Sequence, residues 1–298
     1  MIQGVHEIEL RMHENGYVSD QAIATSIFLL MELKKPILIE GHAGVGKTEV
    51  AKVLAKILDT ELIRLQCYEG LDVSTALYEW NYQKQILRMR LEDGSSHSVE
   101  EKEEVIFGPQ FLLKRPLLSA ITNPDRSAVL LIDEVDRADE EFEAFLLEVL
   151  SDFQVSIPEL GTIKATHIPY VILTSNRTRE LSDALRRRCQ YLWIDYPSFE
   201  KELSILELRL PGINPKLARQ ITAFMQRIRT KSLLKKPGVA ETLDWAASLL
   251  LLHRDWLDRD SVEATLGCIF KDIHDLQRVS KDQLNEVLAE VEAVQNGP

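Results

Sequence analysis

The chain has 298 residues, of which 45% are hydrophobic, so it can bury the core of one large domain or two ordinary ones. Its formal net charge is −12, from 47 acidic and 35 basic side chains, which argues against a general nucleic-acid-binding protein with a basic face. The cysteines Cys67, Cys189 and Cys268 lie far apart and predict thiols in a reducing compartment. No signal peptide or long apolar run is evident, so we expect a cytoplasmic protein without a transmembrane segment.

Strands and helices alternate through the first two thirds of the chain. Residues 1–19 show little periodicity, and Asp20 can cap a helix over 21–33. Apolar or alternating runs predict strands at 36–40, 61–66, 127–132, 170–174 and 191–194. Helices are predicted after the glycine-containing segment that follows the first strand, at 71–91, at 111–121 and after Asp139. This order predicts an α/β fold, in which a parallel sheet is covered by helices on both faces.

Two segments depart from this alternation. Residues 92–104 combine Asp-Gly-Ser-Ser with a run of glutamates and predict a solvated loop. Residues 154–168 alternate on either side of Pro158–Gly161 and predict a hairpin insert.

After Pro197 the pattern becomes entirely helical. Helices are predicted at 198–210, 215–230, 240–252, 260–276 and 280–293. We therefore predict an α/β domain of residues 1–196, which carries the hairpin, and an all-helical domain of residues 197–298.

The segment Gly41–Thr48 reads G-x-x-x-x-G-K-T and lies between a predicted strand and a predicted helix. Glycines let the backbone curl so that successive N–H groups face an anion, and the helix N-terminus adds partial positive charge. Lys47 can reach the β- and γ-phosphates, and the Thr48 hydroxyl can ligate Mg²⁺. The segment predicts a site for ATP and Mg²⁺, formed by Gly41, His42, Ala43, Gly44, Val45, Gly46, Lys47, Thr48 and Glu49.

A second acidic motif follows the strand predicted at 127–132. Asp133 and Glu134 end this apolar run, 86 residues after Lys47 (133 − 47). Asp133 would hold Mg²⁺ together with Thr48, and Glu134 would orient or deprotonate an attacking water. Beside a phosphate-binding loop, this pair predicts hydrolysis of the nucleotide.

Two further sites have both a functional and a structural interpretation. Asn176 follows the next strand, where its amide could contact the γ-phosphate or the water, although asparagine there is often a turn residue. Arg186, Arg187 and Arg188 end a short predicted helix, where arginines bind phosphate or complement the helix dipole.

Together these motifs resemble an AAA+ ATPase, a P-loop NTPase in which a helical lid domain follows the parallel sheet. Further segments resemble the MoxR family and its CoxD-type branch, which serves carbon monoxide dehydrogenase. They are Cys67–Asp72, Ala76–Asn81, Phe107–Pro109, Asp195–Ser198 and Glu241–Ala246. The resemblance implies a ring, often a hexamer, with Asn176 as sensor 1 and Arg188 as an arginine finger. It also implies a protein client and a partner with a von Willebrand factor A domain.

One departure concerns the lid. Many AAA+ proteins carry a sensor 2 arginine at the start of a lid helix, where this chain reads Pro237-Gly238-Val239-Ala240-Glu241. From this absence we expect substitutions among Gly238–Glu241 to change nucleotide affinity only mildly.

We therefore expect an ATPase of the MoxR type that remodels or matures a partner protein or metalloenzyme. The alternatives are a nucleic-acid motor or loader, which the charge disfavours, and a scaffold that binds nucleotide without turnover. A P-loop small-molecule kinase fits the helical domain and the arginine run poorly.

Overall fold

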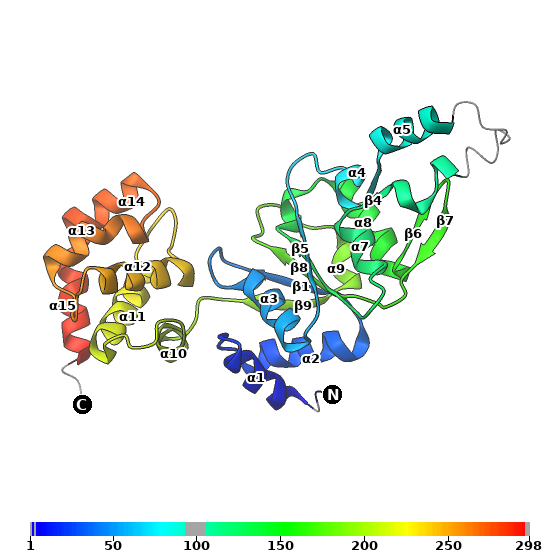
Figure 1. The fold of residues 1–298 in the computed structure, drawn as a ribbon. Helices are drawn as coiled ribbons and strands as arrows, with labels where there is room; N and C mark the ends of the chain where they lie inside the picture. Colours follow the sequence, from blue (N-terminus) through cyan, green and yellow to red (C-terminus); the bar gives the residue numbers. More distant parts are fainter. Residues whose placement is uncertain (1, 3, 93–104, 296–298) are drawn as a thin grey trace. The chain divides into compact units, whose positions relative to one another are not determined.

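A computed structural model describes residue 2, residues 4–92 and residues 105–295 of the chain (Figure 1). The chain forms two compact units. The sheet unit comprises Met1–Ile8, Gln21–Glu40 and Ala51–Trp193, and the helical unit comprises Glu9–Asp20, Gly41–Val50 and Ile194–Pro298. The domain boundary between residues 196 and 197 stays a prediction. Among the described helices, none is both long and apolar enough to cross a membrane.

A five-stranded sheet forms the centre of the sheet unit, with strand order β2-β5-β8-β1-β9. β5 pairs in parallel with β2 and with β8, and β8 pairs in parallel with β1. Every residue of β1 and of β5 is buried, which requires helices on both faces of the sheet and confirms the predicted α/β fold. The strands are β1 (Ile37–Gly41), β2 (Leu62–Gln66), β5 (Val129–Asp133), β8 (Tyr170–Ser175) and β9 (Gln190–Ile194).

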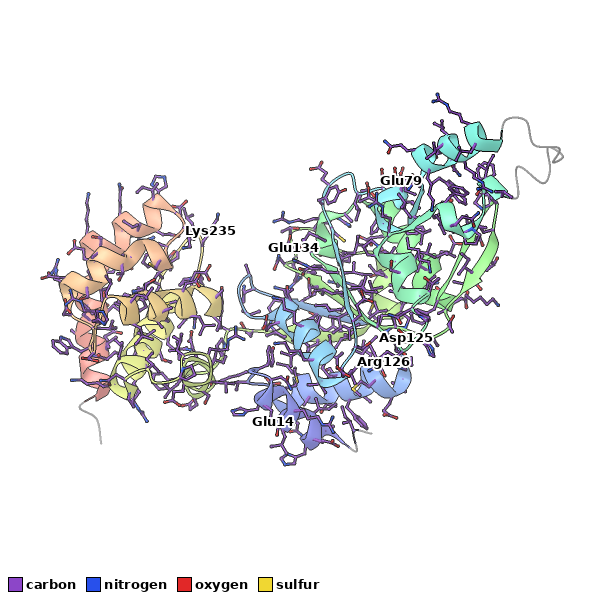
Figure 2. All side chains as sticks on the ribbon, in the orientation of Figure 1. Glu14, Glu79, Asp125, Arg126, Glu134 and Lys235 are labelled. Carbon is purple, nitrogen blue, oxygen red and sulfur yellow. The ribbon has the colours of Figure 1, made fainter. Side chains whose placement is uncertain are left out.

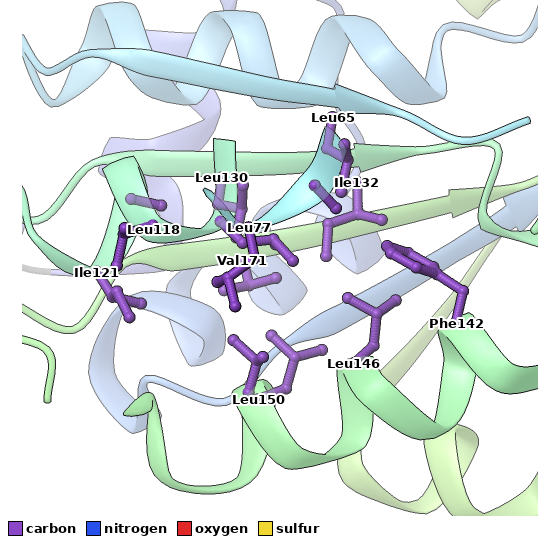
Figure 3. Close-up of a cluster of buried hydrophobic side chains, with 14 of the residues drawn as sticks. Leu65, Leu77, Leu118, Ile121, Leu130, Ile132, Phe142, Leu146, Leu150 and Val171 are labelled. Carbon is purple, nitrogen blue, oxygen red and sulfur yellow. The ribbon is translucent and has the colours of Figure 1, made fainter. Parts of the chain in front are cut away.

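The larger core lies on one face of this sheet (Figure 3). Leu130, Ile132 and Val171 point from β5 and β8 to helices that include α7 and α8, whose Leu118 and Leu146 are fully buried. Side chains alternate along a strand, so Val129 and Leu131 point to the opposite face. The helices before and around the sheet are α1 (Val5–Glu14), α2 (Gln21–Leu33), α3 (Lys47–Ile57), α7 (Pro116–Ile121), α8 (Glu140–Asp152) and α9 (Asp183–Arg188).

The helices predicted at 71–91 and 111–121 are partly wrong, because a two-stranded ribbon interrupts both. β3 (Tyr78–Trp80) pairs antiparallel with β4 (Leu112–Lys114), and Trp80 packs edge-on against Phe107. Only short helices remain on either side of each strand. They are α4 (Val73–Ala76), α5 (Tyr82–Glu92), a 3-10 turn at Pro109–Phe111, and α7.

Helix α1 was not predicted, although Ile8 and Met12, one helical turn apart, are fully buried. The predicted hairpin is confirmed, since β6 (Gln154–Ile157) pairs antiparallel with β7 (Gly161–Lys164). Apart from Glu92, the last residue of α5, the loop predicted at 92–104 lies outside the described residues.

The helical unit contains the predicted C-terminal helices with one division more. Asp272 accepts hydrogen bonds from the amides of His274 and Asp275, and therefore starts a new helix within the predicted 260–276. Phe224 and Trp245 pack in the core, where the indole of Trp245 donates to Thr265 at 2.8 Å. The helices are α10 (Phe199–Arg209), α11 (Pro215–Thr230), α12 (Val239–Leu251), α13 (Arg259–Ile269), α14 (Ile273–Arg278), a π-helical stretch (Val279–Gln283) and α15 (Leu284–Gln295).

We predict that Asp139→Ala lowers the free energy of unfolding by about 1 kcal/mol. The Asp139 carboxylate accepts the amide of Phe142 at 2.8 Å and so satisfies an otherwise unpaired donor at the start of α8. Urea unfolding followed by circular dichroism measures the change. Asp139→Asn keeps an acceptor and serves as the control, which should lose less than half as much. Equal losses in the two variants would show that the capping bond is not the cause.

Candidate functional site

The register of the parallel strands brings polar residues to one edge of the sheet. Gln66 at the end of β2 is aligned with Asp133 at the end of β5. On the far side of β8, Glu40 of β1 is aligned with Ser175. Ligands of open α/β sheets bind beyond such carboxyl ends of the strands. The structure thus collects the chemistry-bearing residues of the sheet unit at the edge where such sites form.

Asp133 is a buried carboxylate that accepts hydrogen bonds from Arg64 and Thr174. Its Oδ2 accepts from Arg64, at 3.1 Å from Nε and 2.5 Å from Nη2, and its Oδ1 accepts from the Thr174 hydroxyl at 2.5 Å. The residue is only 3% exposed, whereas the Arg64 side chain is 50% exposed. A charge this deep requires such hydrogen bonds to be tolerated. They fix the orientation of the carboxylate that the sequence assigns to a metal.

Glu134, which is labelled in Figure 2, leaves the strand in a left-handed conformation, with φ 55° and ψ 49°. A non-glycine residue in this region is strained by roughly 1–3 kcal/mol, and such strain collects at functional sites. Its carboxylate accepts from Gln66 Nε2 at 3.0 Å and from Asn176 Nδ2 at 3.3 Å, and it pairs with Arg137 at 3.0 Å. Glu134, predicted to act on the attacking water, and Asn176, predicted to contact the γ-phosphate or that water, are therefore in direct contact.

The loop that carries Asn176 is held by a buried acid that the sequence analysis did not single out. Asp136 is 3% exposed and accepts from the amide of Asn176 at 3.2 Å. It also accepts from the Thr178 amide at 2.8 Å and the Thr178 hydroxyl at 2.7 Å. Asp136 therefore holds the backbone of Asn176, and the side-chain amide of Asn176 donates to Glu134 from this position.

The predicted phosphate-binding loop belongs to the helical unit and runs into the first turn of α3. Its glycines 44 and 46 have φ of 73° and 93°, which side chains rarely adopt. A Cβ on Gly41 would lie 2.0 Å from the carbonyl oxygen of Ile194, so only glycine fits there. His42, Ala43 and Gly44 are exposed, Val45 and Lys47 are buried, and Gly46, Thr48 and Glu49 are half-buried.

Lys47 curls back into this loop. Its Nζ donates to the carbonyl oxygens of Gly41 at 2.8 Å and His42 at 2.7 Å. Glu49 pairs with Arg209 at 3.3 Å. A lysine ammonium held inside a curled glycine loop at a helix N-terminus fits a phosphate chain, because both supply positive charge to it.

The three arginines of α9 have different surroundings. Arg186 pairs with Glu40, at 3.2 Å, and Glu40 also accepts from the Tyr191 hydroxyl at 3.0 Å. Arg187 is exposed. Arg188 is exposed too, and its Nε donates to the Ser151 hydroxyl at 2.8 Å. Arg186 thus stabilises a buried carboxylate, whereas Arg188 lies on the surface of the sheet unit.

Among the described residues, no group of three or more histidine, cysteine, aspartate or glutamate side chains could hold a metal ion. Magnesium in nucleotide sites needs fewer protein ligands, because it is bound by one or two carboxylates and by the phosphates. Thr48 and the buried, oriented Asp133 are oxygen donors of the right kind for it.

Sequence reasoning missed Arg64, Gln66, Thr174 and Asp136. Arg64 and Gln66 are two residues apart in β2, so their side chains lie on the same face of the strand. The alternation of polar and apolar residues could have indicated this shared face. Their contacts with the acids of β5 follow from strand register, which no local pattern reveals.

The fold and the phosphate-binding loop define a P-loop nucleotide-binding protein of the α/β class. The sequence model of the AAA domain family, dynein-related subfamily, matches residues 36–189, and the chain belongs to this family. It is 27% identical over 227 residues to the uncharacterized protein SAB1265c of Staphylococcus aureus (strain bovine RF122 / ET3-1), covering 72% of this chain and 76% of the relative.

Solved structures support the fold. A mutant of RuvB from Thermotoga maritima matches with a TM-score of 0.50 and 18% identity, covering 92% of this chain and 82% of that one. A second RuvB mutant also matches with a TM-score of 0.50 and 18% identity, covering 94% and 78%. The likeness shows a shared AAA+ architecture.

We predict that Cys67 and Cys189 resist alkylation in the folded protein. Burial raises the pKa of each thiol to about 12, and for Cys67 the nearby carboxylates of Asp133, Asp136 and Glu134 act in the same direction. At pH 8 both are therefore protonated and unreactive. Iodoacetamide labelling at pH 8 with peptide mass spectrometry should modify the half-buried Cys268 first, and the other two only in urea. Rapid labelling of Cys67 in the native protein would contradict this prediction.

Proposed function

We propose that this AAA domain protein hydrolyses ATP at a site formed by Gly41–Glu49, Asp133, Glu134 and Asn176. The observation that supports this proposal is the contact of Glu134 with Asn176 and Gln66, which holds a carboxylate and two amides at one strand edge. A scaffold that only binds nucleotide would not need an oriented carboxylate with a strained backbone.

In this proposal each residue has a separate task. The loop amides and Lys47 bind the phosphates, Thr48 and Asp133 hold Mg²⁺, and Asn176 and Gln66 orient the Glu134 carboxylate. Glu134 accepts the proton of the attacking water. Mg²⁺ held by these residues would neutralise charge on the phosphates.

We further propose a MoxR-type role, in which the chain forms a ring, such as a hexamer, and remodels or matures a partner protein or metalloenzyme. The segments resembling the MoxR family and its CoxD-type branch support this, as does the exposed position of Arg188 on α9. An exposed guanidinium can exchange its surface hydrogen bonds for a nucleotide held by the neighbouring subunit. A protein with a von Willebrand factor A domain is the partner that the family resemblance suggests.

Helix α5 supports a protein client. It exposes the large apolar side chains Tyr82, Ile86, Leu87, Met89 and Leu91, and Figure 1 shows it standing away from the five-stranded sheet. A groove of about 400 Å³ runs between α5 and Phe111, with Lys84 and Arg88 beside it. Exposed apolar surface next to basic groups suits an acidic, partly apolar protein segment.

A nucleic-acid motor is the alternative, since RuvB is described as a Holliday junction branch migration motor. The net charge of −12 disfavours it here. A DNA titration at low salt distinguishes the two, because a motor would bind with strong salt dependence.

We predict that Glu134→Gln binds ATP and Mg²⁺ normally but hydrolyses ATP ~10²–10⁴-fold more slowly. The amide keeps the size of the side chain and loses its capacity to accept a proton, while Asp133 and the loop remain. Phosphate release measures turnover, and a fluorescent ATP analogue measures binding. Arg137→Gln removes a surface contact of the same carboxylate and serves as the control, with a much smaller effect expected. Near-normal turnover of Glu134→Gln would remove Glu134 from this role.

We predict that Arg188 acts on ATP bound by the neighbouring subunit. Lys47→Ala and Arg188→Ala should each be inactive, and mixing them should restore activity at interfaces that combine an intact loop with an intact arginine. Arginine fingers contribute ~10³–10⁵-fold in rate. The ATPase rate is measured across mixing ratios and protein concentrations, with Arg187→Ala as the control. A specific activity that stays constant down to a demonstrated monomer would contradict action in trans.

A further inference from the structure

The helical unit contains a buried ion pair that none of the proposed catalytic steps uses. Arg229 of α11 and Glu202 of α10 pair through two parallel bonds, at 2.6 Å and 2.7 Å, and their side chains are 6% and 0% exposed. Such a fork-to-fork pair fixes both side chains in one orientation. Gln226 and Thr242 also donate to the Glu202 carboxylate, each at 2.7 Å.

The same guanidinium holds the backbone that precedes α12. Arg229 Nε donates to the Pro237 carbonyl oxygen at 2.8 Å, and Nη2 donates to the Gly238 carbonyl oxygen at 3.3 Å. Nη2 also lies 3.1 Å from the Thr242 hydroxyl in the first turn of α12. Arg229 therefore determines where the N-terminus of α12 lies within the helical unit.

That N-terminus packs directly on the phosphate-binding loop. The Ala240 amide donates to the Gly44 carbonyl oxygen at 3.1 Å. A Cβ on Gly238 would lie 2.6 Å from the Ala43 carbonyl oxygen and 2.9 Å from two backbone atoms of Gly44. The φ of Gly238 is −86°, which any residue can adopt. Glycine is required there because the loop approaches so closely.

A second contact joins the pair to the loop. The Arg229 guanidinium lies 5.1 Å from the ring centre of Tyr196, and Tyr196 stacks on His42 with 4.4 Å between ring centres and 11° between planes. Arg229 is thus linked to two residues of the loop. It reaches His42 through Tyr196, and it reaches Gly44 through the backbone at the start of α12.

We propose that the Arg229–Glu202 pair positions the phosphate-binding loop through Gly238. The pair thereby couples nucleotide binding to the helical unit, although no arginine at the start of α12 contacts the phosphates. The proposal rests on the proposed function, because it concerns ATP bound by Gly41–Thr48. Arg229 and Glu202 are positioning residues and touch no nucleotide. Binding that moves the Gly44 carbonyl must change the bond to Ala240, and coupling of this kind is reciprocal.

Gly238→Ala tests the coupling. The added methyl group meets backbone atoms of the loop, which cannot rotate away, so affinity for a fluorescent ATP analogue with Mg²⁺ should fall at least tenfold. This loss of affinity is larger than the mild change that the absence of a sensor 2 arginine predicts for substitutions among Gly238–Glu241. Gly267→Ala is the matched control, because a Cβ at this position of α13 meets nothing within 4 Å, and its affinity should stay within twofold. A Gly238→Ala affinity within threefold of the unsubstituted protein overturns the proposal.

A second test removes the ion pair while keeping the fold. Glu202→Met with Arg229→Met replaces two buried charges by apolar side chains of similar size, which is often neutral for stability. Gln226 still donates to the Pro197 carbonyl oxygen, and the Thr242 hydroxyl can turn its hydrogen to the Gly238 carbonyl oxygen, 3.1 Å away, so neither is orphaned. The readout is hydrogen exchange of the Ala240 amide with and without ATP and Mg²⁺.

In the unsubstituted protein, nucleotide should change this exchange rate several-fold, and in the double variant the change should vanish while affinity falls. Identical exchange with and without nucleotide in the unsubstituted protein overturns the coupling, as does an unaltered response in a folded double variant. Failure of the unsubstituted protein to bind the analogue would instead contradict the proposed function.

Discussion

The parallel pairing of β5 with both β2 and β8 is the constraint on which the sheet unit depends. Gln66, Asp133 and Asn176 are more than a hundred residues apart from first to last, and only the strand register brings them together. A shift of one residue would turn Asp133 to the opposite face of the sheet, away from Thr174. The apolar side chains of β5 prevent such a shift, because every one of them is buried and a slip would exchange their faces. Packing of the core therefore decides the geometry of the candidate site.

Buried acids with arginine partners recur in both units. Asp133 pairs with Arg64, Glu40 with Arg186, and Glu202 with Arg229. Removing one partner of the fully buried Glu202–Arg229 pair costs roughly 3–5 kcal/mol, because it leaves an uncompensated charge in a medium of low dielectric constant. The pairs differ in exposure. Arg64 is half exposed although Asp133 is buried, whereas Arg229 and Glu202 are both buried. The fully buried pair is the one that holds backbone in place, through the bonds from Arg229 to the carbonyl oxygens of Pro237 and Gly238.

The sequence allowed most of the sheet and the motifs of the site to be predicted, because these depend on local patterns. The apolar run of β5 with two acids after it, and the glycine loop before α3, are each contained in a few consecutive residues. The failures share a physical cause. β3 and β4 become strands only because Trp80 meets Leu112 across a separation of more than thirty residues, so each segment alone had the pattern of a helix. The roles of Gln66 and Asp136 were missed for the same reason, since both depend on partners at least forty residues away in the chain. The predicted site residues themselves await the kinetic tests.

No arginine stands at the start of α12, but Arg229, nine residues before Gly238, holds the backbone at this point. A guanidinium in contact with phosphate would attract the nucleotide by charge and would be screened by salt. The Arg229 guanidinium is already neutralised by Glu202, so it can add little charge to a phosphate site, and its effect passes through the carbonyl oxygens of Pro237 and Gly238 instead. A coupling carried by backbone packing depends on shape more than on charge. It also requires glycine on one side of the contact, and Gly238 meets this requirement where a larger residue would push the loop away.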